Sequence, residues 1–111
     1  MKNKAKRLAC IDIGSNAIKY RQYRISSKKS KTFAELDTFK RISVRLGTDA
    51  FKFKKISSET EQKLLESIIR LKEKADKKDI KIISGVATSA MRSVSNGHKI
   101  YKKITKKTDI E

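Results

Sequence analysis

The sequence predicts an α/β domain with a mixed sheet and the element order β-β-β-α-β-α. Two nearly continuous apolar runs, at 8–13 and 80–87, have the length and composition of buried strands. Between them lies a polar stretch with apolar residues at helical spacing, which indicates an amphipathic helix. Strands that precede the helix pair antiparallel, whereas a helical crossover joins parallel strands, so the sheet is expected to be mixed.

The first two strands are expected to form a hairpin. Apart from Asp12, residues 8–13 are apolar without alternation, which is typical of a strand buried on both faces. Residues 17–25, rich in Tyr and Ile, are the expected partner, and the polar residues 26–31 form the next turn. Cys10 lies inside the first run and is interpreted as a small buried residue, because a single thiol builds neither a disulfide nor a metal site.

A third strand is expected at 32–46, where the apolar residues alternate with polar ones near the end. One face then carries Ile42, Val44 and Leu46, and the opposite face carries Arg41, Ser43 and Arg45. Gly47 ends the strand, and Phe51 and Phe53 are expected to cap the core from the following loop.

The remaining elements alternate between helix and strand. Ser58 and Glu61 have the spacing of a capping box, so the first helix is expected to begin there. Its apolar stripe consists of Leu64, Leu65, Ile68, Ile69 and Leu71, and its solvated face of Lys63, Glu66, Arg70 and Lys74. Residues 75–79 lead to the strand at 80–87. A short helical segment is expected from Ala90, and a second one carries Ile100, Tyr101 and Ile104.

The chain is strongly basic, with 29 Lys and Arg against 12 Asp and Glu residues and a net charge of +17. Its hydrophobic content of 37% is low, but the absence of Pro and the clear apolar patterns indicate a folded domain. The lysines are scattered, and neither Arg forks nor aromatic platforms are arranged for reading bases. Specific nucleic-acid binding is therefore disfavoured, while a looser attraction to polyanions stays open.

Nothing in the sequence predicts insertion into a membrane. The charged residues 1–7 precede an apolar run that is too short for a signal peptide and is interrupted by Asp12. No apolar stretch approaches the length needed to span a bilayer. Together with the single cysteine, these features favour a cytoplasmic location.

A small polar turn follows the first apolar strand and is the first candidate site. Asp12 ends the run, and Gly14 permits a ligand to approach the main chain closely and can adopt backbone angles denied to other residues. Ser15 and Asn16 add side-chain donors beside backbone N–H groups, a combination that suits phosphate. Taken alone, the same residues favour an ordinary hairpin turn over a phosphate site.

A second polar stretch follows the strand at 80–87. Thr88 and Ser89 end the strand where a helix begins, and Arg92 comes one helical turn later. A helix N-terminus attracts anions, and an Arg fork adds a bidentate clamp. The alternative is that Thr88 or Ser89 only caps the helix while Arg92 is a surface charge.

These stretches together resemble the exopolyphosphatase/guanosine-pentaphosphatase (Ppx/GppA) family. The matching segments are 11–16 (Ile-Asp-Ile-Gly-Ser-Asn), 44–47 (Val-Arg-Leu-Gly) and 86–92 (Val-Ala-Thr-Ser-Ala-Met-Arg), with Asn96 after the last. The first motif is shared with the actin, sugar-kinase and heat-shock ATPase superfamily, whereas the third is much more specific. The resemblance covers nearly the whole chain.

The resemblance implies a ribonuclease H-like fold and hydrolysis of terminal phosphoric anhydrides in inorganic polyphosphate or guanosine pentaphosphate, with Mg²⁺ as cofactor. It assigns phosphate binding to Gly14, Ser15, Asn16, Thr88, Ser89 and Arg92. Asp12 would stand behind the first phosphate loop, with an indirect role toward the metal, and Arg45 would contact substrate. The chain departs from the family at Ala17, where a second Ser is usual, and at Met91, where Leu is usual.

The resemblance also implies that residues 1–111 form an incomplete subdomain, the N-terminal part of a Ppx/GppA phosphatase domain. The family's catalytic Glu, its second phosphate loop and its acidic Mg²⁺ ligands match positions beyond Glu111, which itself matches the start of the next strand. The fragment alone is therefore expected to be inactive and only marginally stable. Whether the longer enzyme is a homodimer stays open.

Two other functions remain as alternatives. The charge of +17 is compatible with a non-catalytic basic module that binds polyphosphate or nucleic acid. A small-molecule kinase of the same superfamily is disfavoured only by the third motif, at 86–92.

Overall fold

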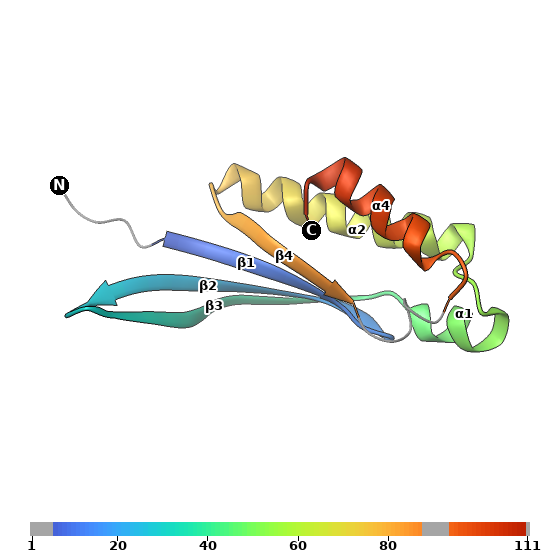
Figure 1. Cartoon of the computed structure of the whole chain (residues 1–111), viewed down its shortest axis with the longest axis horizontal. Helices are drawn as coiled ribbons and strands as arrows, with labels where there is room; N and C mark the ends of the chain where they lie inside the picture. The colour runs from blue at the N-terminus through green and yellow to red at the C-terminus, as the bar shows by residue number, and fades with distance from the viewer. Residues whose placement is uncertain (1–5, 88–93, 111) are drawn as a thin grey trace.

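The computed structural model describes residues 6–87 and 94–110, without the side chains of 28, 49–51, 83 and 84. Figure 1 shows the elements in chain order: β1 (Lys6–Ile13), β2 (Ala17–Lys28), β3 (Lys31–Ser43), α1 (Leu46–Phe53), α2 (Ser58–Lys77), β4 (Lys81–Ala87) and α4 (Gly97–Thr108). The predicted strands and the two main helices are confirmed, whereas α1 replaces an expected loop. The short helical segment expected from Ala90 lies outside the described residues.

The four strands form one mixed sheet in the order β3-β2-β1-β4. β2 pairs antiparallel with both β1 and β3, and β4 pairs parallel with β1 after the crossover through α2. Because β1 and β4 run in the same direction, their carboxyl ends meet at one edge of the sheet. The predicted mixed α/β architecture is therefore confirmed.

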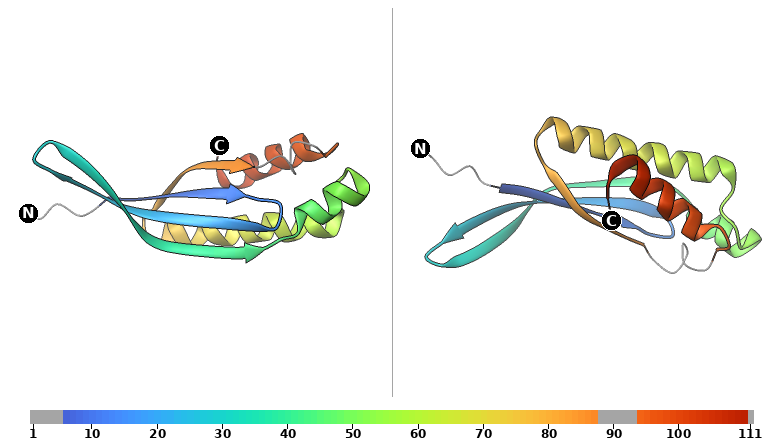
Figure 2. Two further views of the ribbon diagram at one scale, coloured as in Figure 1. Left: turned by 90° about the horizontal axis from the view of Figure 1, so that it is seen from below. Right: turned by 45° about the horizontal axis from the view of Figure 1, so that its top comes forward.

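Both main helices cover the same face of the sheet. α2 and α4 lie side by side above it in Figure 1, and the two views of Figure 2 agree. In β1, Ala9, Ile11 and Ile13 are buried beneath them, while the alternating residues are only half-buried. The expectation that this strand is buried on both faces is wrong, because no described element covers the second face. Cys10 lies on that second face and is half-buried.

Local capping explains where α2 begins and ends. The N-cap is Ser57, not Ser58, because its hydroxyl accepts a hydrogen bond from the Thr60 N–H. At the other end, the Asp79 N–H donates to the Asp76 carbonyl and the Ile80 N–H to the Ala75 carbonyl, the pattern of a Schellman motif. The helix therefore continues through residues expected in a connection. Its buried side chains are Leu64, Ile68, Leu71 and Ala75.

The segment after β3 departs most from expectation. β3 ends at Ser43, and the chain enters α1 at Leu46 instead of a loop. Val44 and Leu46 are buried as their alternation predicted. Phe53 is 67% exposed, so the expectation that it caps the core is wrong. The side chain of Phe51 lies outside the described part.

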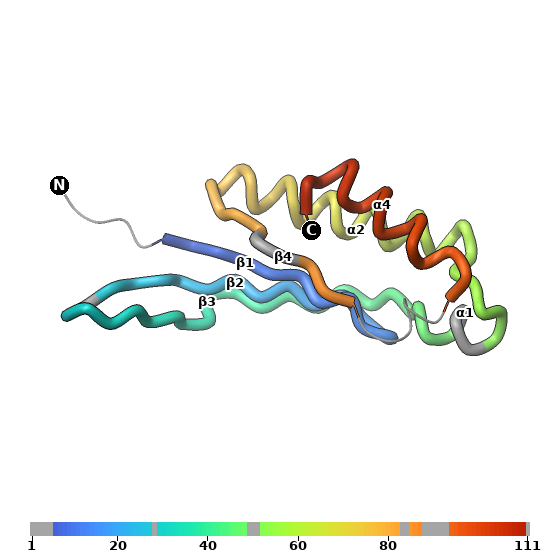
Figure 3. Tube along the Cα trace, in the orientation of Figure 1, coloured from blue at the N-terminus to red at the C-terminus, as the bar shows by residue number. Residues whose placement is uncertain are grey.

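The β2–β3 hairpin extends beyond the rest of the sheet, as the tube in Figure 3 shows. β1 begins opposite Ile25, so residues 26–33 pair only within the hairpin. Lys29 and Ser30 both have positive φ angles, 50° and 67°, as the mirror-image turn of a two-residue hairpin requires.

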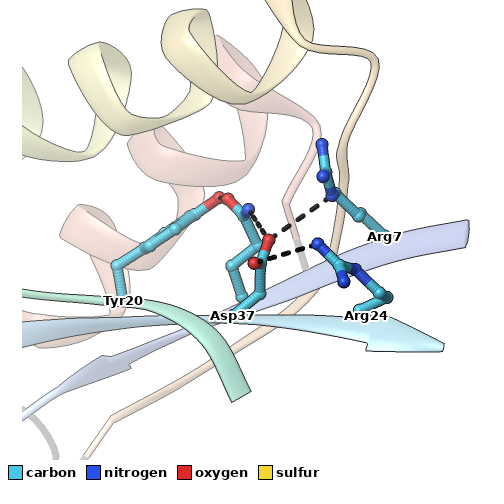
Figure 4. A network of polar contacts seen from close by, with 5 residues as sticks. Arg7, Tyr20, Arg24 and Asp37 are labelled. Carbon is cyan, nitrogen blue, oxygen red and sulfur yellow. Dashed lines mark hydrogen bonds and ion pairs between the residues drawn. The ribbon is translucent and has the colours of Figure 1, made fainter. Parts of the chain in front are cut away.

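A bulge in β3 builds a polar network on the helix-covered face (Figure 4). The register shifts so that Gln22 faces Thr38 and Tyr23 faces Leu36, which leaves Asp37 as the extra residue. The Tyr20 hydroxyl donates to Gln22 Oε1 at 2.8 Å, and Gln22 Nε2 donates to Asp37 Oδ2 at 2.7 Å. Burial, and secondly the Asp37 charge, raise the pKa of Tyr20 above its usual value.

The same carboxylate forms ion pairs with two arginines. Arg7 Nε lies 3.4 Å from Asp37 Oδ2, and Arg24 Nη2 lies 3.7 Å from Asp37 Oδ1. These contacts tie the start of β1 and the middle of β3 to β2, at a distance from the β1–β2 turn.

Candidate phosphate-binding site

The β1–β2 turn closes tightly behind Asp12. Ile13 pairs with Ile18, and the Gly14 N–H donates to the Ala17 carbonyl at 2.9 Å. A Cβ on Gly14 would lie 3.1 Å from that carbonyl oxygen, and its φ is not positive. Glycine is therefore favoured here by the close approach of two main-chain segments, and the expected use of unusual backbone angles is not found.

The β1–β2 turn is fixed by two main-chain hydrogen bonds from the junction between β3 and α1. The Val44 N–H donates to the Asn16 carbonyl at 3.0 Å, and the Gly47 N–H donates to the Ser15 carbonyl at 2.7 Å. Both carbonyls therefore accept hydrogen bonds from the β3–α1 junction. The N–H groups of Ser15 and Asn16 make no main-chain hydrogen bond to any residue of the described part. Asn16 is exposed and Ser15 is half-buried, so donors remain available to a ligand.

Gly47 positions the turn, a role that its place after an alternating strand did not predict. A Cβ at Gly47 would lie 3.1 Å from Ser15 Cβ and 3.3 Å from the Ser15 carbonyl oxygen. A side chain at residue 47 would therefore have to push Ser15 away by a few tenths of an ångström, so glycine suits the close contact of α1 with the turn. The signal available in the sequence was the position of Gly47 at the end of the Val-Arg-Leu-Gly match.

Asp12 lies on the uncovered face, directly before the turn. Its Cα partners are Lys19 on β2 and Val86 on β4, and its Oδ2 lies 3.9 Å from Arg21 Nη1. About a third of the side chain is exposed, 32%. Among the described residues, no group of three His, Cys, Asp or Glu side chains could hold a metal ion.

The second sequence motif begins beside this turn. β4 ends at Ala87, which pairs with Ile13. Thr88, Ser89 and Arg92 themselves lie outside the described residues, so their predicted contacts with phosphate remain predictions. The parallel pairing brings the end of β4, which they follow in sequence, next to Gly14.

Arg45 stands between the two residues that hold the turn, Val44 and Gly47. Its side chain is exposed, and it lines a hollow of about 270 Å³ with Thr48, Glu59 and Lys63 among others. The predicted contact of Arg45 with substrate remains a prediction.

Asn96 has a structural role in the described chain. Its side-chain Oδ1 accepts from the Ile56 N–H at 2.9 Å, and its Nδ2 donates to the Ile56 carbonyl at 2.8 Å. The Ser95 N–H also donates to the Lys54 carbonyl, at 2.9 Å. These bonds fasten the connection between α1 and α2 to the start of α4, while Asn96 makes no side-chain cap on α4 itself.

The fold matches solved structures of Ppx/GppA proteins. A family member from Aquifex aeolicus superposes with a TM-score of 0.83 at 20% identity, over 96% of this chain and 34% of the other. An exopolyphosphatase from Cytophaga hutchinsonii superposes with a TM-score of 0.76 at 21% identity, over 96% and 33% of the two chains. No protein-family model and no curated protein matches the sequence.

These similarities confirm the predicted ribonuclease H-like fold, as found in the N-terminal part of Ppx/GppA proteins. The chain spans about a third of the length of these structures. In the described residues, no helix is long and apolar enough to cross a membrane.

Proposed function

We propose that this chain belongs to the Ppx/GppA family and supplies the first phosphate-binding loop of a hydrolase. The proposed substrates are inorganic polyphosphate and guanosine pentaphosphate, from which a terminal phosphate is released. The observation that carries the proposal is the externally held turn at Ser15 and Asn16, whose N–H groups make no main-chain bond in the described part. A fixed pair of N–H donors is the arrangement that binds phosphate oxygens without reorganisation.

Further donors come from the residues that follow β4. Thr88 and Ser89 would contribute hydroxyl groups beside Gly14, and Arg92 would neutralise phosphate charge through a bidentate guanidinium. The pairing of Ala87 with Ile13 supports this arrangement. Arg45 would approach from the β3–α1 junction, which holds the same turn.

Magnesium fits this site only as a partner of the phosphates. Mg²⁺ commonly binds one or two carboxylates together with substrate phosphates and water, and Asp12 offers one partly exposed carboxylate. When bound, the ion would neutralise charge on the phosphate oxygens. Arg21 pairs with Asp12 and holds it at the edge of the turn.

We assign no general base to this chain. Hydrolysis needs a group that activates water, together with stabilisation of the charge that develops in the transition state. The 111-residue chain is therefore expected to release no phosphate from polyphosphate, even with Mg²⁺. Robust release that depends on Arg92 would contradict this assignment.

Binding of tripolyphosphate tests the loop directly. Amide resonances of Ser15 and Asn16 are expected to shift in two-dimensional NMR spectra during titration, and Asn16→Leu, which removes a donor at an exposed position, should weaken binding. Gln62→Leu is the matched control, because it removes an amide on the exposed side of α2. Guanosine pentaphosphate in a parallel titration compares the two substrates. Shifts confined to surface lysines, with an unchanged affinity of Asn16→Leu, would refute the loop assignment.

A non-catalytic polyanion-binding module is the second candidate, and the charge of +17 favours it. It predicts steeply salt-dependent binding that survives Arg92→Met. Binding that changes little with added salt would exclude it.

A further inference from the structure

A basic region lies at the end of the sheet opposite the β1–β2 turn. It is a hollow of about 730 Å³ between the start of β1, the end of β2 and the connection from α2 to β4. We call this the basic hollow. Its lining residues are Lys6, Arg7, Leu8, Arg24, Lys78, Asp79 and Lys81.

The lysines of the basic hollow are not neutralised within the described protein. Lys6, Lys78 and Lys81 form no ion pair there, whereas Arg7 and Arg24 share Asp37. Asp79 is the one acidic residue among the described residues of the lining. The positive charge therefore exceeds the negative charge at this end of the sheet.

The crowding of positive charge continues on the neighbouring surface. Lys78 also lines a small adjoining pocket with Lys40 and Lys74. Burial, and then the charges of Lys74 and Lys78, lower the pKa of Lys40. A bound anion would relieve this repulsion.

The dipole of α2 accounts for only some of these lysines. Lys74 and Lys77 lie in the last turn of the helix, where positive charge is favourable. Lys6, Arg24 and Lys81 belong to strands, and no helix end explains them. Their convergence on one hollow is the feature that favours an anionic ligand.

We infer that the basic hollow is a second binding site for a linear polyphosphate chain, separate from the loop at Ser15 and Asn16. The inference rests on the proposed function for the identity of the polyanion. The described lining residues include no aromatic side chain on which a base could stack, so a bare phosphate chain fits the hollow better than a nucleic acid.

The two sites are too far apart for a short ligand to occupy both. The nearest lining residue of the hollow on β1 is Leu8, seven residues before Ser15, which at about 3.3 Å per residue gives a separation of about 23 Å. Tripolyphosphate can therefore reach only one site at a time, whereas a long chain has phosphates for each.

Two aspartates offer a matched pair of variants. Asp79 and Asp109 both have left-handed backbone angles, with φ of 56° and 62°, so glycine should be tolerated at both. Each substitution removes one negative charge, but only Asp79 lines the basic hollow. Asp79→Gly should therefore strengthen binding of long-chain polyphosphate about twofold or more at low salt, and Asp109→Gly should change it less.

Removing two lysines from the basic hollow tests the opposite effect, a loss of positive charge. Lys78→Met with Lys81→Met should weaken binding of long-chain polyphosphate about fivefold or more and reduce the salt slope by about 1.4 units. Lys99→Met with Lys102→Met on the exposed side of α4 is the charge-matched control and should have a much smaller effect. Lys78→Arg with Lys81→Arg should retain binding, which separates charge from folding.

The outcomes distinguish this inference from the proposed function. Two results together support the inference. The NMR shifts that tripolyphosphate causes at Ser15 and Asn16 are the same in every variant of the basic hollow. The affinity for long-chain polyphosphate changes in these variants and not in their charge-matched controls. Equal losses in the two lysine pairs would overturn it while leaving the loop intact. Hollow-dependent binding without any shift at the loop would support the second site and refute the first. An oligonucleotide of equal phosphate number that binds the hollow more tightly would overturn the choice of ligand.

Discussion

At the scale of single residues, the geometry of the turn at Ser15 and Asn16 depends on the lack of a side chain at Gly47. The Gly47 N–H holds the Ser15 carbonyl at 2.7 Å, and no side chain separates α1 from the turn. The sequence places Gly47 after an alternating strand, which explains a strand end but does not reveal a contact with Ser15. Such a contact depends on how three elements pack, and local patterns carry no information on it.

Gly47→Ala is expected to weaken binding of tripolyphosphate about fivefold, equivalent to about 1 kcal/mol or one hydrogen bond. The added Cβ would displace Ser15, although alanine favours a helix over glycine by about 1 kcal/mol. Calorimetric titration measures the affinity, and chemical denaturation reports stability separately. An unchanged affinity would show that the turn moves freely and that Gly47 does not position it.

A single lysine should make stability depend on pH. The pKa of Lys40 is lowered, first by burial and then by Lys74 and Lys78, so the folded state disfavours its charged form. The resulting penalty is complete below the lowered pKa and disappears as the pH rises through the unfolded value of 10.5. Lys40→Met should therefore raise the denaturation midpoint at pH 7, and the gain should shrink toward pH 10.5.

Lys99→Met, at an exposed site on α4, is the control for general charge reduction. An equal gain in both variants at pH 7 would attribute the effect to net charge and not to crowding around Lys40.

At the scale of elements, the sequence predicts periodicity better than boundaries. Ile42 and Val44 alternate as expected, but the hydroxyl that caps α2 is that of Ser57, one residue before the expected one. Neighbouring serines offer equivalent caps, and packing of the helix decides between them. The sequence does not predict the bulge at Asp37 either. The residues around Asp37 would expose similar side chains with or without an extra residue in β3, so the local pattern does not distinguish the two registers.

Asp37→Ala should destabilise the protein by about 1–3 kcal/mol. It would leave the buried Gln22 amide without its acceptor and two arginines without their carboxylate. Asp76→Ala is the control, since it removes only an exposed pair with Lys72 and should cost less than about 0.5 kcal/mol. Urea denaturation of both variants measures the difference. Equal effects would show that the bulge network adds no stability.

At the scale of the whole molecule, apolar side chains remain exposed on one face of the sheet, unlike in a domain whose sheet is covered on both faces. The helices bury one face of the sheet, while Leu36, Phe39 and Val86 are 57%, 48% and 61% exposed. The apolar run at 8–13 predicted burial on both faces, and only the face below the helices fulfils it. β3 is also an edge strand, which adds unpaired main-chain groups to this surface.

Leu36→Lys should reduce aggregation of the chain and change the free energy of unfolding by less than about 0.5 kcal/mol. The side chain is exposed, and a charged residue on an edge strand opposes pairing with another chain. Light scattering at rising concentration measures the first effect, and thermal melting measures the second. A large loss of stability would mean that Leu36 contributes to the core.

The position of Cys10 makes the coverage of the second face of the sheet measurable. The chain contains one cysteine, and its half-buried thiol lies on that face, in register with Arg21 and Ser84. The rate at which a thiol reagent alkylates it is therefore an intrinsic reporter of anything that comes to lie against the sheet. Slower labelling in the presence of a partner segment would register docking there without any engineered probe.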